Sequence, residues 1–174
     1  MKKTQSASLS RLFVVCLLGT VCSFAQQGSV PAATKPAKIH VDAPFAQYVV
    51  VKEKAAHPEI QKLGLHAVPP EQTQNVIIAS NLPEKIGKVS AASDLQLVAS
   101  GEPQAQKIDD EGYWDTFVPF HDRNGKIIGF LVMEVPFSSA KTRDHAIEIG
   151  ATIRNEFERQ IPTLRSLFGP APQQ

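Results

Sequence analysis

The sequence predicts an α+β domain, an antiparallel sheet with long N-terminal and C-terminal helices. Three observations predict it. Two β-rich runs flank a tight polar turn between Tyr113 and Phe137, one amphipathic stretch begins near Asp42, and a longer one ends near Gln160. Apolar residues recur at every second position in the β-rich runs and at every third or fourth position in the other two stretches. These are the periods of strands and helices.

The first 25 residues have the layout of a secretory signal peptide. Lys2, Lys3 and Arg11 precede an uncharged run from Leu12 to Phe24, and small residues follow, so we expect cleavage after Ala25. The run is shorter than the roughly 20 apolar residues that a membrane span needs. The sequence therefore predicts a soluble mature chain that is periplasmic or secreted.

Cysteine content and charge agree with export. Both cysteines, Cys16 and Cys22, lie inside the signal peptide, so the mature chain has no thiol for a disulfide or a nucleophile. A lipoprotein would be acylated at Cys22, but the three residues before it lack the usual leucine and small-residue pattern. Cleavage leaves 15 basic and 17 acidic residues, a formal net charge of −2 instead of +1. This balance predicts no nucleic-acid partner.

The mature chain has the size of a single domain with its own hydrophobic core. Residues 26–41 are rich in Pro, Ala and polar side chains and predict a flexible leader. Residues 42–168 carry all the periodic patterns and form the expected domain. Residues 169–174 are expected to be a disordered tail.

The first half of the domain predicts a broken helix followed by extended segments. Asp42 is the expected N-cap of an amphipathic helix, and the proline after His57 predicts a break there, with a short second turn ending near Gly64. Residues 65–68 precede two prolines, which predicts an extended segment or a sheet edge. Residues 75–80 form a short apolar run that predicts a buried strand.

The middle of the domain predicts a short helix, an edge strand and the hairpin. Ser90 or Ser93 is the expected cap of a helix that ends before Gly101. Residues 104–108 are expected to form an edge strand. Residues 122–125 end in Asn-Gly and reverse the chain between the two β-rich runs. The second run is apolar on both faces, which predicts a central strand.

The last helix follows the hairpin. Ser138 or Ser139 is its expected N-cap, and Pro162 is expected to end it near Gln160. Its apolar positions form one stripe, so it should cover a single face of the sheet. The other face is then available for a ligand pocket.

Three motifs stand in order along this domain: Ile86-Gly87-Lys88, Gly101-Glu102-Pro103, and a hairpin with Val118-Pro119, Asp122, Gly125-Lys126 and Gly129. In this order they resemble the extracytoplasmic Cache-type sensor domains, which are related in shape to PAS folds. The resemblance covers roughly residues 42–165. It implies a PAS-like, single-Cache domain, here as a stand-alone secreted protein, whose open sheet face binds a small polar metabolite: an organic acid, an amino acid or an amine.

Cache-type domains usually sit between two transmembrane helices and drive a cytoplasmic effector. We expect neither a second membrane segment nor an effector domain in this chain, so the resemblance implies a ligand-binding, sensor-like domain without catalytic or effector activity of its own. Its expected partners are the metabolite and a membrane-bound receptor or a second copy of the chain. The alternative is a structural or interaction module that pairs through its N-terminal helix with itself or with such a receptor.

Six residues are candidates for the ligand site because they place aromatic or polar groups at strand ends or on the central hairpin. They are His66, Ser80, Asn81, Tyr113, Trp114 and Asp115. Aromatic walls beside a carboxylate suit a cationic ligand. Strand alternation puts Tyr113 and Asp115 on one face and Trp114 on the other, so Trp114 is alternatively a core residue. His66 is alternatively a structural hydrogen-bonding residue. Asn81 alternatively bonds its own backbone in a turn.

No metal site, cofactor or catalytic centre is expected. The five histidines show neither the H-x₃-H nor the H-E-x-x-H spacing. The turn at residues 122–125 has only the start of a calcium loop. The chain has no G-x-S-x-G motif and no cysteine after the signal peptide, so we expect a binding protein and not an enzyme. An unrecognised hydrolase would need a nucleophile within hydrogen-bond reach of a base.

Overall fold

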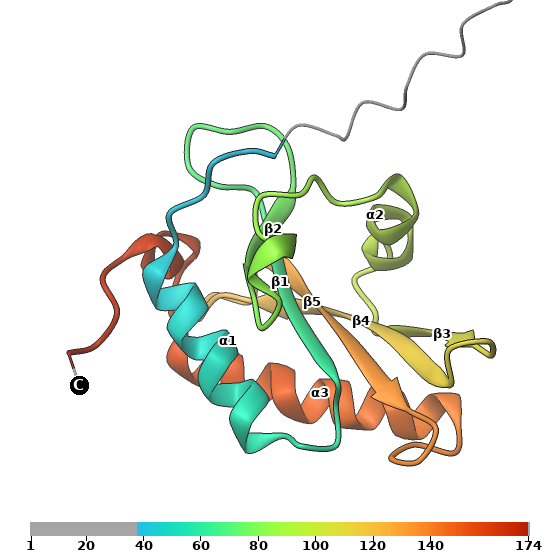
Figure 1. Ribbon diagram of the computed structural model, residues 1–174. Coiled ribbons are helices and arrows are strands. Elements are labelled where there is room, and N and C mark those ends of the chain that lie inside the picture. Colours follow the sequence, from blue (N-terminus) through green and yellow to red (C-terminus); the bar gives the residue numbers. More distant parts are fainter. Residues whose placement is uncertain (1–37, 174) are drawn as a thin grey trace, which may run out of the picture. The chain divides into compact units, whose positions relative to one another are not determined.

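The structure is a computed structural model and describes residues 38–173. Its helices are α1 (Pro44–Ala56), α2 (Ala92–Val98) and α3 (Arg143–Gln160), with short 3₁₀ helices η1 (Pro83–Lys85) and η2 (Leu164–Phe168). Its strands are β1 (Lys62–Ala67), β2 (Val76–Ser80), β3 (Gln104–Ile108), β4 (Tyr113–His121) and β5 (Ile127–Pro136). They form one antiparallel sheet in the order β2-β1-β5-β4-β3 (Figure 1). The predicted α+β class is confirmed.

The hairpin of β4 and β5 is the centre of this sheet. The two strands pair from Tyr113 with Pro136 to His121 with Ile127, and β5 lies third among the five strands. The turn closes where the N–H of Asp122 donates to the carbonyl of Lys126 at 2.9 Å. The predicted hairpin and the predicted central position of its second strand are therefore confirmed.

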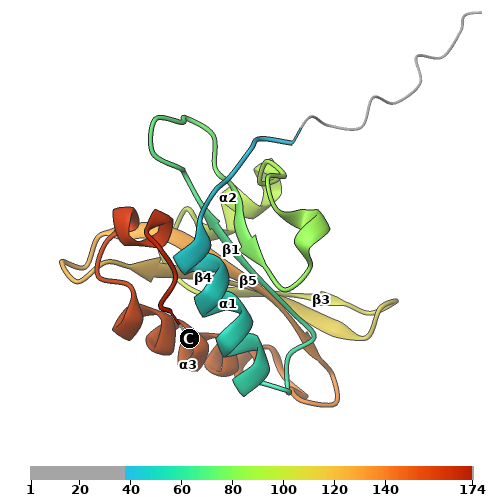
Figure 2. The ribbon, with the colours of Figure 1, turned by 60° about the vertical axis from the view of Figure 1, so that its left-hand side comes forward.

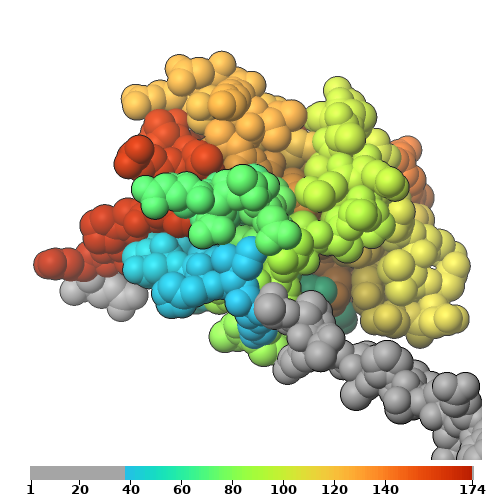
Figure 3. Space-filling view, turned by 90° about the horizontal axis from the view of Figure 1, so that it is seen from above, coloured from blue at the N-terminus to red at the C-terminus, as the bar shows by residue number. Residues whose placement is uncertain are grey.

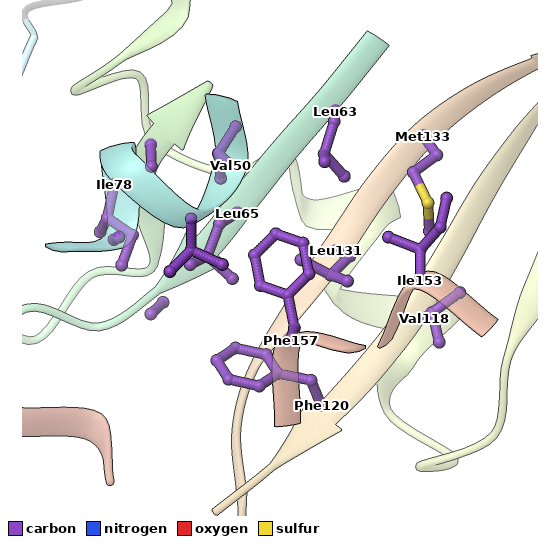
Figure 4. Packing of buried hydrophobic residues seen from close by; sticks show 14 of the residues in the cluster. Val50, Leu63, Leu65, Ile78, Val118, Phe120, Leu131, Met133, Ile153 and Phe157 are labelled. Atoms are coloured by element: carbon purple, nitrogen blue, oxygen red, sulfur yellow. The ribbon is translucent and has the colours of Figure 1, made fainter. Parts of the chain in front are cut away.

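Helices α1 and α3 cover one face of the sheet, and α2 lies over part of the other (Figures 1 and 2). We call the face under α1 and α3 the covered face and the opposite one the open face. Side chains from strands and helices interdigitate on the covered face (Figure 4). The labelled members of this core are Val50, Leu63, Leu65, Ile78, Val118, Phe120, Leu131, Met133, Ile153 and Phe157.

Gly150 brings α3 close to the sheet. A Cβ at this position would stand 2.8 Å from Val118 Cγ2 and 3.1 Å from Thr116 Cγ2. Both distances are shorter than ordinary van der Waals contacts, so any larger residue would push the helix away from β4. Because glycine has no side chain, Gly150 sets the spacing between α3 and the sheet.

The N-terminal half differs from the prediction in one element. Helix α1 ends at Ala56, as the proline after His57 predicts, but the residues near Gly64 belong to strand β1 and not to a second helical turn. Leu63 and Leu65 alternate with Gly64, and β1 pairs with β5 on one side and β2 on the other. Strand pairing and burial therefore override the helical spacing of the apolar residues. Residues 65–67 are extended, as predicted, but they do not form a sheet edge, because β2 is the edge strand.

The helix caps also differ. Helix α3 begins after Thr142, whose hydroxyl accepts a hydrogen bond from the N–H of His145 at 3.2 Å, and not after Ser138 or Ser139. Its end at Gln160 agrees with the prediction from Pro162. Helix α2 follows Ala91, so its N-cap is neither Ser90 nor Ser93. The hydroxyl of Ser90 is hydrogen-bonded to His66 instead. Strand β3 is an edge strand, as predicted.

Both ends of the described chain contact the domain. Ile39, within the predicted leader, donates its N–H to the carbonyl of Gly87 at 2.8 Å. Gly87 has a φ of +82°, and a Cβ there would stand 2.2 Å from the carbonyl oxygen of Ile39, so only glycine fits. At the other end, the carbonyl of Gly169 accepts from Phe45 N–H at 3.1 Å.

The predicted signal peptide, residues 1–25, lies outside the described residues, as does the leader up to residue 37. Within residues 38–173, no helix combines the length and the apolar character that a membrane crossing requires.

Candidate functional site

The open face of the sheet holds a cavity of about 220 Å³, which we call the open-face cavity. Strands β1, β2, β4 and β5 form its floor. Residues 85–94, from the end of η1 to the first turn of α2, form its wall. The floor residues are Lys62, Gly64, His66, Ile77, Ser80, Asp115 and Val132, and the wall residues are Lys85, Lys88, Val89, Ser90, Ala91 and Asp94. The cavity thus gathers charged and hydrogen-bonding groups on a face whose neighbouring area is apolar.

His66 is the most buried polar side chain of this floor apart from Ser80, with 4% of its surface exposed. Its Nδ1 lies 2.8 Å from Ser90 Oγ, and Ser90 Oγ donates to Asn75 Oδ1 at 2.6 Å. A hydroxyl has one hydrogen, so Ser90 must accept from His66 Nδ1–H. The unprotonated nitrogen of His66 is therefore Nε2, the atom on the side of Gly64.

Burial, with a smaller contribution from the charge of Lys62, lowers the pKa of His66 to about 3. His66 is therefore neutral at physiological pH and offers Nε2 only as a hydrogen-bond acceptor. A Cβ on Gly64 would stand 3.6 Å from Nε2, so the glycine leaves the space beside this nitrogen free. An N–H or O–H group of a ligand fits that position.

Asp115 supplies a second acceptor. Its Oδ1 is buried and has no hydrogen-bond partner among residues 38–173. Burial raises the pKa of Asp115 to about 6; Lys62 opposes this effect, and Glu134 adds to it. Lys62 is itself bound to Glu134 Oε1 at 2.6 Å. A buried carboxylate oxygen without a donor is costly, and a ligand that donates an N–H group would remove this cost.

Three of the six predicted site residues line the cavity: His66, Ser80 and Asp115. Ser80 has a structural bond as well, because its Oγ accepts from Leu82 N–H at 3.1 Å. Asn81 does not line the cavity; its Oδ1 accepts from Leu63 N–H at 2.8 Å and extends the pairing of β1 with β2. The role of Asn81 is structural, but the alternative of a bond to its own backbone in a turn is wrong, because the bond joins two strands.

Tyr113 and Trp114 also lie outside the cavity lining. The hydroxyl of Tyr113 donates to Glu111 Oε2 at 3.0 Å. Trp114 points to the covered face, where its Nε1–H donates to the carbonyl of Ala140 at 3.0 Å and its ring packs edge-on against Phe137. The alternation of β4 therefore separates Trp114 from Asp115, as the core alternative for Trp114 requires.

Sequence reasoning missed the lysines and Asp94 of this cavity. Lys62, Gly64 and His66 alternate along β1, and this period of two is the available signal. The expected helical turn ends near Gly64, so only His66 falls in the expected extended segment. Ser90 was noticed only as a possible helix cap. Lys88 and Asp94 lie in or near short elements whose approach to β1 has no local sequence signal.

Ser90 and His66 also stand at the distance of a nucleophile and its base. Two facts argue against such a role. The hydroxyl hydrogen of Ser90 goes to Asn75 and not to the imidazole, and a base with a pKa of about 3 removes protons poorly at neutral pH. The pair is better described as a hydrogen bond that joins the floor of the cavity to its wall.

A larger groove of about 530 Å³ lies beside this wall. The loop before β2, helix α2, the start of β5 and the segment of η2 meet around it, on the side of the molecule that Figure 3 shows. Its floor includes Ile128, Phe130 and Leu164, and its charged residues are Asp122, Lys126 and Arg165. The ring of Phe130 contacts His66, with 4.5 Å between ring centroids. The open-face cavity is smaller, but its buried acceptors give it more chemical specificity.

No family model matches the chain, and no curated protein matches it. Solved structures are similar in fold. A protein from Burkholderia vietnamiensis described as a GAF sensor is 14% identical, with a TM-score of 0.50 over 70% of this chain and 76% of that chain. The C-terminal domain of the E. coli transcriptional regulator KdgR is 13% identical, with a TM-score of 0.45 over 70% and 96% of the two chains. A phycocyanobilin-bound GAF domain from a cyanobacterial phytochrome is 10% identical, with a TM-score of 0.37 over 63% and 84%.

The first of these similarities shows that the chain has an α+β fold like that of the Burkholderia vietnamiensis protein. At 14% identity it concerns the fold alone.

Proposed function

We propose that this chain is a small-molecule-binding, sensor-like domain without catalytic activity, and that its ligand occupies the open-face cavity. The observation that carries the proposal is the pair of buried acceptors, His66 Nε2 and Asp115 Oδ1, on the floor of one cavity. A sensor-type fold supports it by analogy. The finer assignment to Cache-type, PAS-like domains rests on the three sequence motifs.

The cavity chemistry favours a small ligand that carries an amino group. The volume of the open-face cavity, about 220 Å³, lies below the roughly 300–1,000 Å³ of sites for drug-sized molecules. Two acceptors on the floor require donors on the ligand, and an ammonium group supplies up to three. Lys85 and Lys88 on the wall can bind a carboxylate at the other end of the ligand. Among the expected metabolites, an amino acid meets both requirements, an amine the first and an organic acid the second.

A thermal-shift screen of amino acids, amines and organic acids tests the proposal. A ligand at roughly 100 times its Kd should raise the melting temperature by about 5–10 °C. Asp115→Asn should abolish the shift, because it replaces a charged acceptor with a neutral amide. Gly64→Val should also abolish it, because the new side chain extends into the cavity; its Cβ would make only an ordinary contact of 3.6 Å with His66 Nε2.

Tyr113→Phe is the matched control. Tyr113 lies two residues from Asp115 on the same strand but bonds Glu111 outside the cavity, so this variant should keep the full shift. The proposal fails when no compound of the three classes raises the melting temperature, or when the shift survives both Asp115→Asn and Gly64→Val.

We also propose export to the periplasm or the medium, through the signal-peptide pattern of residues 1–25. N-terminal sequencing of the protein recovered from a periplasmic extract should begin at Gln26 or within a few residues of it. A protein that keeps Met1 and stays in the cytoplasm would overturn the proposed location.

A second candidate function is that of an interaction module that pairs through α1. Val51 on this helix is 52% exposed and lies beside Tyr48 and Gln47 in a surface depression of about 550 Å³. An exposed aliphatic side chain on a helix suits contact with a membrane-bound receptor or with the same helix of a second chain. Light scattering after size-exclusion chromatography distinguishes the two functions: a ligand-free dimer that Val51→Glu converts to monomer favours this one.

A further inference from the structure

A cluster of ionisable side chains lies where α1 crosses α3, on the covered side of the sheet and away from the open-face cavity (Figure 2). Glu53 and His57 come from the last turn of α1 and its C-cap, and Glu156 comes from α3. One donor atom from each of the three lies within 4.8 Å of the other two. Such a set, an imidazole nitrogen with two carboxylate oxygens, can bind a metal ion.

Glu53 is a buried carboxylate on a face of α1 that is otherwise apolar. It follows Ala46, Val49 and Val50 in the buried stripe of α1, and only 3% of its surface is exposed. Its Oε1 accepts from Gln160 Nε2 at 2.7 Å. Its Oε2 lies 3.9 Å from His57 Nε2. A carboxylate at an otherwise apolar helix position needs a positive charge beside it.

The imidazole of His57 is oriented as in metal sites. Its Nδ1 lies 2.7 Å from Glu59 Oε1, and its Nε2 lies 2.8 Å from Glu156 Oε2. When Nδ1–H donates to Glu59, Nε2 carries a lone pair that faces a carboxylate, and either a proton or a metal ion must lie between these two acceptors. A carboxylate on the far nitrogen of a ligating histidine is the common arrangement that fixes its tautomer.

The neighbouring side chains supply little of the missing positive charge. Lys52 Nζ is 3.6 Å from Glu53, and Arg159 is 3.9 Å from Glu156, both longer than a hydrogen bond. Both side chains are mostly in solvent, 52% and 69% exposed. Three carboxylates, counting Glu59, therefore surround one imidazole.

We propose that Glu53, His57 and Glu156 bind a divalent transition-metal ion of the zinc class, with His57 coordinating through Nε2 and Glu59 holding its Nδ1–H. Tetrahedral zinc with bonds of 2.0–2.2 Å places its donors about 3.3 Å apart. The observed distances from His57 Nε2, 2.8 Å to Glu156 and 3.9 Å to Glu53, lie on either side of this value. The donor atoms of Glu53 and Glu156 lie within 4.8 Å of each other.

Access and donor type agree with this assignment. A surface cavity of about 330 Å³, lined by Glu53 and Glu156 among others, leaves a path for the ion and space for water as a fourth ligand. The imidazole nitrogen disfavours calcium and magnesium, which prefer oxygen ligands. The ion would join the C-terminal ends of two helices that cover the same face of the sheet.

The sequence signal for this site is the spacing of Glu53 and His57, four residues apart at the end of α1. Histidine-pair spacings do not detect the site, because it has one histidine and its third ligand stands 99 residues after His57.

The competing occupant of the space between the carboxylates is a proton on His57, and a titration separates the two. Isothermal titration calorimetry with ZnCl₂ at pH 7.5 should show one saturable site in the purified protein and none in His57→Gln or Glu156→Gln. Glu59→Gln keeps all three ligands and should weaken zinc binding about 10–100-fold. Zinc should raise the melting temperature, and MgCl₂ at the same concentration should not.

His121→Gln is the matched control. His121 Nδ1, at the end of β4, lies 2.8 Å from Glu158 Oε1 of α3, the helix that also carries Glu156. This histidine–glutamate pair belongs to no three-ligand cluster among residues 38–173, so zinc binding should persist unchanged. Circular dichroism checks that each variant is folded. If His57→Gln does not fold, the weaker zinc binding expected of Glu59→Gln tests the site instead. The proposal is overturned when the protein binds no zinc, or when binding survives both His57→Gln and Glu156→Gln.

Discussion

Asp115 and Thr116 are neighbours on β4, and each holds a buried side-chain oxygen without a partner among residues 38–173. They point to opposite faces of the sheet. Thr116 lies under α3 in the covered face, fully buried among aliphatic side chains. Asp115 lies in the floor of the open-face cavity. The same defect therefore has two meanings: in a filled core it only lowers stability, whereas in a cavity it leaves a position for a ligand to occupy.

The two faces of the sheet have different roles: one holds the hydrophobic core, and the other holds the cavity. On the covered face, α1 and α3 fill the space above the strands with aliphatic and aromatic side chains, and this burial drives folding. On the open face, the short helix α2 covers only the apolar patch of Phe117, Phe130 and Val132. The part of β1 and β4 that it leaves uncovered carries His66 and Asp115. The first face should respond to substitution in stability, and the second in binding.

The largest expected effect is on the covered face. Phe157 is fully buried there, and Phe157→Ala should lower the free energy of unfolding by about 3–5 kcal/mol, because a sealed void replaces the ring. Val132 forms part of the cavity floor, and Val132→Ala should cost only about 1–1.5 kcal/mol, because the new space joins an existing cavity. Urea denaturation of both variants measures the difference. Equal losses would show that the open face is packed as tightly as the covered one.

The next effect is pH-dependent and belongs to Asp115. Its pKa of about 6 in the folded protein exceeds the reference value of 3.8, so between these pH values the native carboxyl keeps a proton that the unfolded chain has lost. The wild-type stability contribution of Asp115 therefore falls as pH rises from about 4 to 6. Asp115→Asn removes this loss and should be more stable than wild type at pH 7 by about 1–2 kcal/mol, and equal to it near pH 3.5.

His66 gives the opposite slope, because its pKa is lowered in the folded state and stability is lost as pH falls from 6.5 towards 3. Comparison of Asp115→Asn with wild type at each pH cancels this contribution. Denaturation series at pH 3.5, 5 and 7 provide the measurement. A difference between the two proteins that does not change with pH would show that Asp115 is solvated and that the cavity floor is not as described.

The sequence predicts the central part of the fold better than the site. Asn124-Gly125 and the alternation on both sides of it are local signals, and they suffice for β4, β5 and the separation of Trp114 from Asp115. Strand β1 has no such signal, because its glycine and its apolar spacing suit a helix end as well as a strand. Its pairing with β5 decides between them, and that pairing brings together residues about 70 positions apart.

The site depends on the same long-range contacts. His66 was a candidate from its place before two prolines, but its role as an acceptor follows from Ser90 and Asn75, which no spacing connects to it. Lys85 and Lys88 reach the cavity through the loop that Gly87 allows to turn. Sequence patterns therefore found residues on the right strands, and tertiary packing selected among them.

The smallest expected effect is that of Thr116, and it tests the contrast between Thr116 on the covered face and Asp115 on the open face. Thr116→Val replaces a buried, unpartnered hydroxyl with a methyl group of similar size and should raise the free energy of unfolding by about 1 kcal/mol. Because Thr116 does not titrate and does not line the cavity, the gain should be the same at pH 3.5 and pH 7, and ligand binding should be unchanged. Asp115→Asn, one residue away, should gain stability only at the higher pH and lose binding. A Thr116→Val variant that is less stable than wild type would mean that the hydroxyl has a partner in solution, and the contrast between the two faces would then rest on Asp115 alone.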